Sequence, residues 1–173
     1  MVLFQQALAP GGITDGVTNL EMTAAYATIA NQGTYTRPVF YSQVIDSNGR
    51  VLLDNTTPTT HTVLKASTAS LLTQGMTSVI TEGTGTSAKL DGKMPVSGKT
   101  GTTSSEYDLW FCGYTPYLTA SIWTGYDENV SLSGDQAYHE RLWAKIMNQI
   151  DSVKKYKAKS FKMSKDVKKY DIC

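Results

Sequence analysis

The chain has 173 residues, of which 40% are hydrophobic, and this suits a single globular domain with a core of its own. Its net charge is +1, and its two cysteines, Cys112 and Cys173, are too few for a disulfide framework. It has no run of about 18 apolar residues and no charged leader followed by an apolar stretch, which excludes a membrane-spanning helix and a recognisable signal peptide. We therefore expect a soluble chain.

The first predicted element is a helix that starts at Thr18-Asn19-Leu20-Glu21. This is a capping-box pattern, in which the Thr hydroxyl and the Glu carboxylate each accept a hydrogen bond from an otherwise unpaired amide. Apolar residues then recur at helical spacing from Leu20 to Ala30. Gln32-Gly33 ends the helix, because glycine best tolerates the left-handed conformation of a C-cap.

A β-hairpin is predicted next. Its strands, residues 37–44 and 50–53, flank Asp46-Ser47-Asn48-Gly49, whose Asn-Gly pair suits a tight turn with positive φ. Residues 55–62 are rich in Thr and Pro and are predicted to form a polar loop. A second helix is predicted over residues 65–81, and a glycine-rich turn follows it.

Three strands and a last helix complete the predicted fold. Short turn-rich segments separate the strands, which predicts an antiparallel meander. The predicted strands are residues 96–103, 109–115 and 118–126. In the last helix, residues 135–150, Leu142, Ile146 and Ile150 recur four apart and are predicted to pack on the sheet. The predicted fold class is α+β, an antiparallel sheet flanked by helices.

The strand Val96–Thr103 carries the most chemistry. Lys99 supplies a positive charge with three donors, and the hydroxyls of the neighbouring threonines supply directional hydrogen bonds. Gly101 lacks the Cβ that would keep a ligand away from the backbone. Together these residues are typical of a carboxylate-binding segment. The plainer alternative, an exposed strand lysine beside a bulge glycine, would explain the three residues Lys99-Thr100-Gly101 equally well on their own.

Ser97-Gly98-Lys99-Thr100 also resembles the end of a Walker A phosphate-binding loop, but its spacing argues against that reading. The motif needs four residues between its glycines, whereas five separate Gly92 from Gly98. It also needs a helix after the loop, whereas the residues after Gly101 are turn-rich and lead into an aromatic strand. Nucleotide binding is therefore not expected.

Further motifs accompany Lys99-Thr100-Gly101. Downstream lie Asp108, Trp110-Phe111-x-Gly113-Tyr114-Thr115-Pro116 and Trp123-x-Gly125-Tyr126-Asp127, and upstream lies Gly11-Gly12-x-x-x-Gly16-Val17-Thr18-x-Leu20-Glu21-Met22-x-x-Ala25-Tyr26. With these motifs, residues 7–150 resemble the transpeptidase domain of class A, bifunctional penicillin-binding proteins, in which Lys-Thr-Gly is one of three motifs. The resemblance implies a penicillin-binding transpeptidase fold, which is serine β-lactamase-like.

The chain departs from the family pattern in two places. Position 19 is Asn, where the family commonly has Pro. The family's nucleophile motif, Ser-x-x-Lys, and its second motif, Ser-x-Asn, both precede the segment present here, and the chain contains no Ser-x-Asn. Its one Ser-x-x-Lys match, Ser152-Val153-Lys154-Lys155, lies in a lysine-rich tail, where burial would not lower a lysine pKa. We interpret it as a chance match and expect no nucleophile in this chain.

The resemblance implies an intact enzyme in which a serine attacks the D-Ala-D-Ala carbonyl of a peptidoglycan stem peptide, an amine of a second stem resolves the acyl-enzyme, and β-lactams acylate the same serine. Lys99 would direct positive potential toward the serine of the second motif. Thr100 and Thr102, with Gly101 and Thr103 beside them, would bind the terminal carboxylate of the donor or drug. The backbone amide of Thr102 would be one of two oxyanion donors.

The resemblance also implies a division of the chain. Residues 1–150 are expected to be the C-terminal half of the transpeptidase domain, and Met1–Gln5 reads as an abrupt start, so the other half is expected to be missing or present as another chain. The expected partners are stem peptides, β-lactams and that half, with no nucleic acid, cofactor or metal. The parent is expected at the extracytoplasmic face of the bacterial membrane, with a separate glycosyltransferase domain, and this chain alone is expected to be inactive.

The last predicted segment, residues 151–173, is a basic tail. It carries eight bases and three acids, whereas residues 1–150 carry eight bases and twelve acids. A flexible, solvated linker is one interpretation, and attraction to an anionic membrane or cell-wall polymer is the other. Three functions remain open for the whole chain: a fragment of a D,D-transpeptidase, a non-catalytic peptidoglycan- or β-lactam-binding module of the same fold, and an unrelated α+β binding protein.

Several side chains are predicted to have structural rather than functional roles. His61 and His139 have no neighbouring cluster of metal-binding residues, and Cys112 is expected to be a small buried hydrophobe. Asp127-Glu128 follows a strand and is expected to be a solvated turn. Aromatic residues on adjacent strands are expected to pack in the core or across strands rather than to form a stacking platform. They are Trp110, Phe111, Tyr114 and Trp123.

Overall fold

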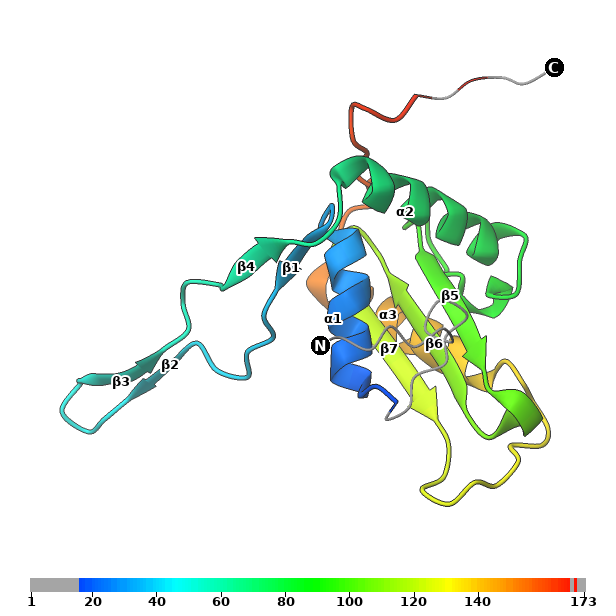
Figure 1. Ribbon diagram of the computed structural model, residues 1–173, viewed down its shortest axis with the longest axis horizontal. Helices are drawn as coiled ribbons and strands as arrows, with labels where there is room; N and C mark the ends of the chain where they lie inside the picture. Colours follow the sequence, from blue (N-terminus) through cyan, green and yellow to red (C-terminus); the bar gives the residue numbers. More distant parts are fainter. Residues whose placement is uncertain (1–15, 169, 171–173) are drawn as a thin grey trace, which may run out of the picture.

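The computed structural model describes residues 16–168 and residue 170 (Figure 1). Its elements are, in order, α1 (Asn19–Ala30), β1 (Thr34–Thr36), β2 (Gln43–Ile45), β3 (Val51–Asp54), β4 (Thr60–Thr62), α2 (Ala66–Thr81), the 3-10 turn η1 (Thr86–Ala88), β5 (Ser97–Thr102), the 3-10 turn η2 (Ser104–Glu106), β6 (Leu109–Tyr114), β7 (Thr119–Thr124) and α3 (Tyr138–Lys154). The sequence features at Met1–Gln5, Gly11-Gly12 and Cys173 lie outside the described residues.

The centre of the fold is a three-stranded antiparallel sheet in the order β5-β6-β7, which confirms the predicted meander. Lys99 lies opposite Cys112, and Cys112 lies opposite Ser121. Helix α1 covers the face of β6 and β7 on which Ser121 contacts Thr23, and α2 lies along β5. Helix α3 lies behind the sheet in Figure 1. The predicted α+β class is therefore confirmed.

The main core lies between the sheet and α3. The ring of Phe111 meets that of Trp143 edge to face, with centroids 5.1 Å apart, and the indole N–H of Trp143 donates to the carbonyl of Ala120 at 3.0 Å. This bond satisfies the one polar atom that the large side chain buries. The core cluster consists of Ile80, Ala88, Val96, Phe111, Trp143, Ala144 and Met147.

Helix α1 begins and ends as its sequence predicts. The Glu21 amide donates to the Thr18 hydroxyl at 3.2 Å, and the Thr18 amide donates to the Glu21 carboxylate at 2.8 Å, which completes the capping box. At the other end, Gly33 has a φ of +87°, and a Cβ there would lie 2.1 Å from the carbonyl oxygen of Leu64. Only glycine fits both the conformation and this close approach. Helix α2, residues 66–81, also agrees with its predicted range.

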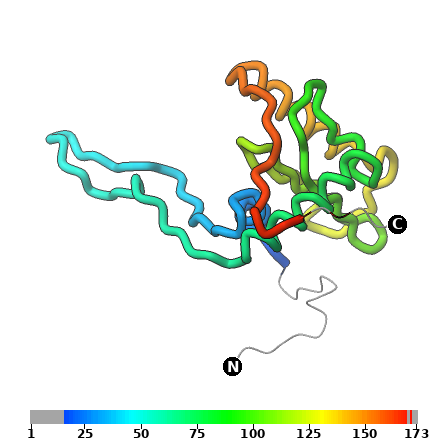
Figure 2. Tube along the Cα trace, turned by 90° about the horizontal axis from the view of Figure 1, so that it is seen from above, coloured from blue at the N-terminus to red at the C-terminus, as the bar shows by residue number. Residues whose placement is uncertain are grey.

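Residues 34–62 form a two-part β-ribbon that extends away from the body (Figures 1 and 2). The predicted turn is confirmed, with Gly49 at a φ of +81°. The predicted strand at 37–44 is mostly wrong, because only residues 43–45 pair with β3. The predicted loop at 55–62 is also partly wrong, since Thr60–Thr62 pairs with Thr34–Thr36. That pairing joins residues about 26 apart, and local propensity carries no signal for it.

Helix α3 buries a different face from the one that its spacing predicted. Leu142 is 44% exposed and Ile146 is 41% exposed, whereas Trp143 and Met147 are each 1% exposed. The prediction is therefore wrong for Leu142 and Ile146, whereas Ile150 is partly buried and packs against the core as predicted. The two sets are offset by one residue, which is about 100° around a helix, and the larger Trp143 buries more apolar area when it faces the sheet. The helix also continues to Lys154, beyond the predicted end at residue 150.

Candidate active site

Strand β5 is an edge strand, and its register fixes the direction of its backbone groups. The Thr103 amide donates to the carbonyl of Asp108 at 3.2 Å, so this pair is hydrogen-bonded. Because hydrogen-bonded pairs alternate along an antiparallel ladder, Gly101 and Lys99 also pair with β6, whereas the amides and carbonyls of Thr102 and Thr100 point away from it. The Thr102 amide therefore faces the open edge of the sheet.

The predicted carboxylate-binding residues lie together at this edge. Lys99 is exposed, and its ammonium group donates to the Thr100 carbonyl at 2.8 Å and to the Thr100 hydroxyl at 3.3 Å. The Thr100 hydroxyl is 2.8 Å from that of Thr84, which follows α2. Thr102 and Thr103 are exposed at the end of the strand, and Gly101 is half-buried against Trp110. The structure thus leaves one ammonium group and two threonine side chains accessible next to an outward-facing amide.

Gly98 is required by close packing rather than by ligand approach. A Cβ at this position would lie 2.8 Å from the Cys112 carbonyl oxygen and 2.9 Å from the Phe111 ring, both of which belong to β6. A Cβ at Gly101 would meet only the Cβ of Trp110, at 3.2 Å. The two glycines therefore differ in role. Gly98 allows β5 to pack closely on β6, and Gly101 leaves its position on β5 without a side chain next to the open edge of the sheet.

Asp108 fixes the end of β5 through hydrogen bonds, a role that the sequence did not reveal. Its carboxylate accepts hydrogen bonds from the Thr103 hydroxyl at 2.9 Å and from the indole N–H of Trp123 at 2.8 Å, and its amide donates to the Thr103 hydroxyl at 2.9 Å. These bonds tie the turn after Thr102 to β7. Trp123 lies fifteen residues along the chain, so only the folded sheet brings it to Asp108.

A groove of about 600 Å³ opens beside Asp108 and Thr103, between the first residues of α1 and the end of the sheet. Trp110 and Trp123 form one wall as a cross-strand pair with ring centroids 6.4 Å apart, and apolar side chains come from Val17, which precedes α1, and from Met22 within it. The groove is therefore apolar on two sides and polar where Thr103 and Asp108 meet it. Phe111 and Tyr114 are fully buried, which confirms that the strand aromatics pack in the core and across strands.

Neither Ser152 nor Cys112 has the surroundings of an activated nucleophile in the described part of the chain. Ser152 lies in the last turn of α3, where its hydroxyl is exposed and donates to the Gln149 carbonyl at 2.8 Å. Cys112, directly opposite Lys99, is 3% exposed, and burial raises the pKa of its thiol to about 12, with a weaker opposing effect of a hydrogen bond to Ser121. A thiol with that pKa is not ionised near neutral pH, so Cys112 is the buried hydrophobe that its sequence context predicts.

The remaining titratable candidates do not form a site. Among the described residues, no group of three His, Cys, Asp or Glu side chains could hold a metal ion. The ring of His61 contacts that of Tyr35 in the β-ribbon in a tilted arrangement, with ring centroids 4.9 Å apart, and His139 is buried at the start of α3. Asp127 and Glu128 are exposed, as expected of a solvated turn. Over the same residues, no helix is both long and apolar enough to cross a bilayer.

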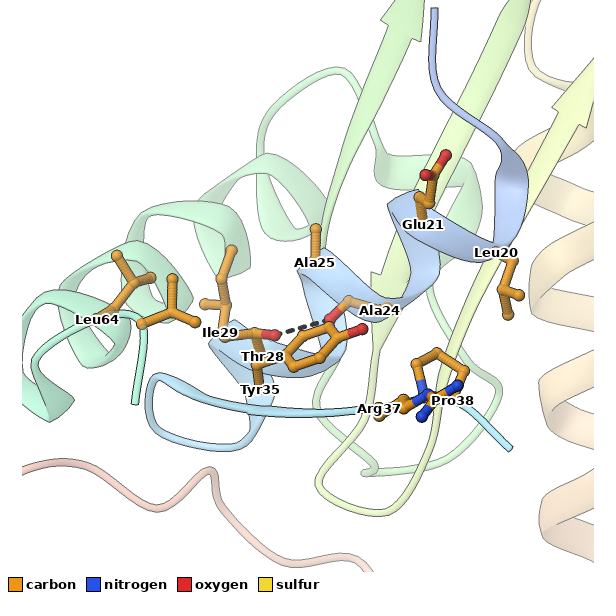
Figure 3. Close-up of a pocket in the computed structure, with 11 residues that line it drawn as sticks. Leu20, Glu21, Ala24, Ala25, Thr28, Ile29, Tyr35, Arg37, Pro38 and Leu64 are labelled. Atoms are coloured by element: carbon orange, nitrogen blue, oxygen red, sulfur yellow. Dashed lines mark hydrogen bonds between the residues drawn. The ribbon is translucent and has the colours of Figure 1, made fainter. Parts of the chain in front are cut away.

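A second groove, of about 590 Å³, lies between α1 and the base of the β-ribbon (Figure 3). Leu20, Ala24 and Ile29 line it from the helix, and Tyr35 and Pro38 line it from the ribbon. It contains none of the residues of β5. Its lining is mostly apolar, with Glu21, Thr28 and Arg37 as the polar members, and it holds none of the residues predicted to take part in acyl transfer.

Comparison with known proteins agrees with the geometry. Residues 3–150 match the family described as penicillin binding protein transpeptidase domain. Penicillin-binding protein 1A of Clostridium acetobutylicum is 39% identical over 82% of this chain, and penicillin-binding protein 1F of Bacillus subtilis is 37% identical over 83% of it. The chain spans only 17% and 21% of the lengths of these two relatives.

Solved structures give the same result. The penicillin-binding protein PonA1 from Mycobacterium tuberculosis superposes with a TM-score of 0.72 and 29% sequence identity, over 83% of this chain and 40% of that one. The structure of PonA1 in complex with penicillin V superposes with a TM-score of 0.71 and 27% identity.

Proposed function

Because this chain belongs to the penicillin-binding protein transpeptidase family, we propose that β5 forms one wall of a D,D-transpeptidase active site that cross-links peptidoglycan stem peptides. The chain spans about a fifth of the length of the curated relatives, so the reaction belongs to a larger protein. In this proposal the nucleophilic serine and the lysine beside it lie outside the 173 residues, because the sequence contains no Ser-x-Asn and its one Ser-x-x-Lys is at the exposed end of α3.

The observation that carries the proposal is the outward-facing amide of Thr102 at the open edge of the sheet. An unpaired strand amide is a preorganised donor, because its direction is fixed by the ladder behind it. In an acyl transfer it would donate to the oxyanion that forms on the attacked carbonyl. The same edge can accept an extended peptide, which pairs with the backbone groups of Thr100 and Thr102.

The side chains of β5 supply the electrostatic part of the site. A stem peptide and a β-lactam both present a carboxylate near the bond that is attacked. Lys99 would attract this carboxylate, and the hydroxyls of Thr100 and Thr102 would donate hydrogen bonds to it. In this chain the Lys99 ammonium group donates a hydrogen bond to the Thr100 carbonyl. A ligand or the serine of the second motif would replace this contact.

The parent enzyme would act outside the cytoplasmic membrane, where its substrate is, and would carry a glycosyltransferase domain in the remaining length. Non-covalent affinity of the isolated chain for β-lactams is expected to be weak, because an exposed strand works in water of high dielectric constant. The proposed chemistry uses serine, lysine and backbone donors and assigns no role to a nucleic acid.

The test is covalent labelling with a fluorescent penicillin. The 173-residue chain alone should acquire no label, and neither should the upstream half of the domain expressed alone. The two halves mixed and co-purified should acquire label on the upstream half. The control is the same mixture with the serine of the upstream Ser-x-x-Lys motif replaced by alanine, which should remain unlabelled.

Two results would contradict the proposal. Label on the isolated chain would show that the chain contains its own nucleophile. A stable complex of the two halves that stays unlabelled would instead favour a non-catalytic peptidoglycan-binding module of the same fold.

A further inference from the structure

The segment after α3 lies across the body of the protein. Figure 2 shows it as an orange-to-red tube that leaves α3 and returns toward α1 and the start of α2. Residues 156–164, here called the strap, are held by two aromatic contacts. Tyr156 stacks on Tyr117 with ring centroids 4.3 Å apart and an interplanar angle of 4°, and Phe161 meets the buried Tyr114 edge to face at 5.5 Å. Two side chains of the strap thus pack against aromatic rings of the body, Tyr156 against Tyr117 and Phe161 against Tyr114.

Three hydrogen bonds fix the backbone of the strap. The Tyr117 hydroxyl donates to the Lys157 carbonyl at 2.8 Å, and the Gln32 side-chain amide donates to the Lys162 carbonyl at 2.7 Å. The Ser164 amide donates to the hydroxyl of Ser70 at 2.8 Å, and Ser70 is fully buried in α2. These bonds come from three different elements of the body, so the strap has a defined path over about eight residues.

The strap and its flanks carry a row of lysines, here called the basic stripe. It consists of Lys154, Lys155, Lys157, Lys159, Lys162, Lys165 and Lys168, all of them exposed. One acidic residue, Asp166, lies among them. Three of the residues between the lysines contact the body: Tyr156, Phe161 and Ser164. Within the described part of the chain, the one salt bridge joins Arg141 to Asp135 and involves none of the stripe. Between residues 16 and 168, the one side-chain contact of a stripe ammonium group is that of Lys159, which lies 3.8 Å from the centre of the Tyr117 ring.

We propose that the basic stripe is a docking surface for a linear phosphate polymer. Fixed, exposed charges of one sign without intramolecular partners raise the local concentration of a polyanion and bind it through its phosphates. The stripe is a single row, at most about 40 Å long over the eleven residue steps from Lys157 to Lys168 if they are extended. A row matches charges that repeat along one chain, whereas a membrane offers a plane and would engage the stripe no better than scattered lysines.

The stripe is separate from the acyl-transfer wall. The strap crosses the end of the sheet at Tyr114 and Tyr117, next to the start of β5, and the Thr102 amide lies at the other end of that strand. The five residue steps of β5 from Ser97 to Thr102 correspond to roughly 17 Å. A polymer on the stripe therefore leaves the open edge of β5 accessible.

The test is binding of long-chain inorganic polyphosphate to the 173-residue chain, measured by calorimetry at low salt. Replacing Lys157, Lys162 and Lys165 by glutamine removes three charges and leaves the strap contacts in place. It should weaken binding at least about tenfold, since one such lysine near an anionic surface contributes about fivefold. The matched control replaces Arg50, Lys93 and Lys145 by glutamine, which changes the net charge equally at exposed sites of the body. It should weaken binding by less than about threefold.

A second variant tests whether the fixed path matters. Tyr156→Ala with Phe161→Ala keeps every charge but removes the aromatic contacts, so binding should weaken and proteolysis after the strap lysines should accelerate. Circular dichroism checks that both sets of variants remain folded. Equal loss in the lysine variant and its control, unchanged binding in the aromatic variant, or tighter binding to phosphatidylglycerol vesicles than to polyphosphate would each overturn the proposal.

Discussion

At the scale of single residues, the chemistry proposed for Lys99-Thr100-Gly101 depends on strand register as much as on side chains. The alternation of the antiparallel ladder turns the amide of Thr102 outward, and Asp108 holds the end of the strand against β7. Gly98, which looks like part of the motif, is required by the packing of Phe111 and the Cys112 carbonyl. On the proposed function, neighbouring residues of this one short segment therefore serve ligand binding, attachment of the strand end to β7 and sheet packing separately.

The outward amide of Thr102 can be deleted without touching the ladder. Thr102→Pro removes that donor at an edge position where proline is tolerated, and the preceding Gly101 can adapt to the ring. In the assembled transpeptidase we expect the rate of penicillin acylation to fall about 10²- to 10³-fold, the usual loss for one oxyanion donor. Stopped-flow labelling measures it.

The matched variant is Thr102→Ala, which keeps the amide and loses only the hydroxyl. Its acylation rate should fall far less than that of Thr102→Pro. Equal rates for the two variants would show that the side chain matters and that the amide of Thr102 is not a donor in the reaction.

At the scale of elements, α3 shows how one helix can carry two apolar stripes. Trp143, Ala144 and Met147 face the sheet, and Leu142, Ile146 and Val153 remain 44%, 41% and 71% exposed. The buried face also contains two polar residues, His139 and Glu140, at 2% and 4% exposure, and neither ring nitrogen of His139 has a hydrogen-bond partner among the described residues. An uncharged His139 is the form that such a site accepts.

This burial makes the stability of the fold depend on pH. Desolvation lowers the pKa of His139 below 6.5, with a weaker opposing contact from the Trp110 backbone, so the unfolded chain binds a proton before the folded chain does. The stabilising contribution is present above pH 6.5 and is lost as the pH falls. Urea unfolding at pH 7.5 and pH 5.5 should therefore show a decrease in the free energy of unfolding that is smaller in His139→Gln.

Glu140 acts in the opposite direction. Burial raises the pKa of its carboxyl above 4.5, so the folded chain keeps a proton that the unfolded chain releases, and stability decreases as the pH rises through that range. Because Glu140 is present in both the parent and His139→Gln, its contribution cancels when the pH dependence of the two proteins is compared. An identical change in both proteins between pH 7.5 and pH 5.5 would show that His139 is not the responsible group.

At the scale of the whole molecule, the chain exposes apolar surfaces on several sides. They include the outer stripe of α3, the groove between α1 and the ribbon, and the ribbon itself, where Phe40 is 86% exposed. A soluble monomer rarely leaves so much contiguous apolar surface uncovered. On the proposed function, the upstream half of the transpeptidase domain covers part of it, and the outer stripe of α3 is the most regular candidate.

Association with that half should depend on the outer stripe. Leu142→Gln with Ile146→Gln leaves the buried face of α3 unchanged, so the chain should keep its helix content and its unfolding midpoint. Its affinity for the upstream half should fall about tenfold or more, because each half-exposed side chain contributes about 1 kcal/mol when it becomes buried. Analytical ultracentrifugation or pull-down of the two halves measures this loss.

The matched variant replaces two polar residues of the same helix, Lys145→Gln with Gln149→Ala. It should bind the upstream half as the parent does. If both double variants bind with the parent affinity, the stripe is not part of the interface between the halves.

Several features followed from the sequence alone because their signals are local. The capping box of α1 and the Asn-Gly turn at Gly49 depend on residues within a few positions of one another, and short turns between successive strands predict the three-strand meander. All three are present. The family resemblance rested on the motifs around Lys99, and the comparisons confirm it. The roles of Lys99 to Thr103 in the reaction remain predictions.

Other features were decided only by tertiary structure. The pairing of β1 with β4, the face that α3 buries, the bonds from Asp108 to Trp123 and the contacts of the strap all join residues distant in the sequence. The division at residue 150 into a body and a flexible tail also remains a prediction, although residues 156–164 contact the body. Local propensity and spacing depend on residues that are close in the sequence. These contacts depend instead on how much apolar area the whole fold buries and on how many of its buried polar groups find hydrogen-bond partners.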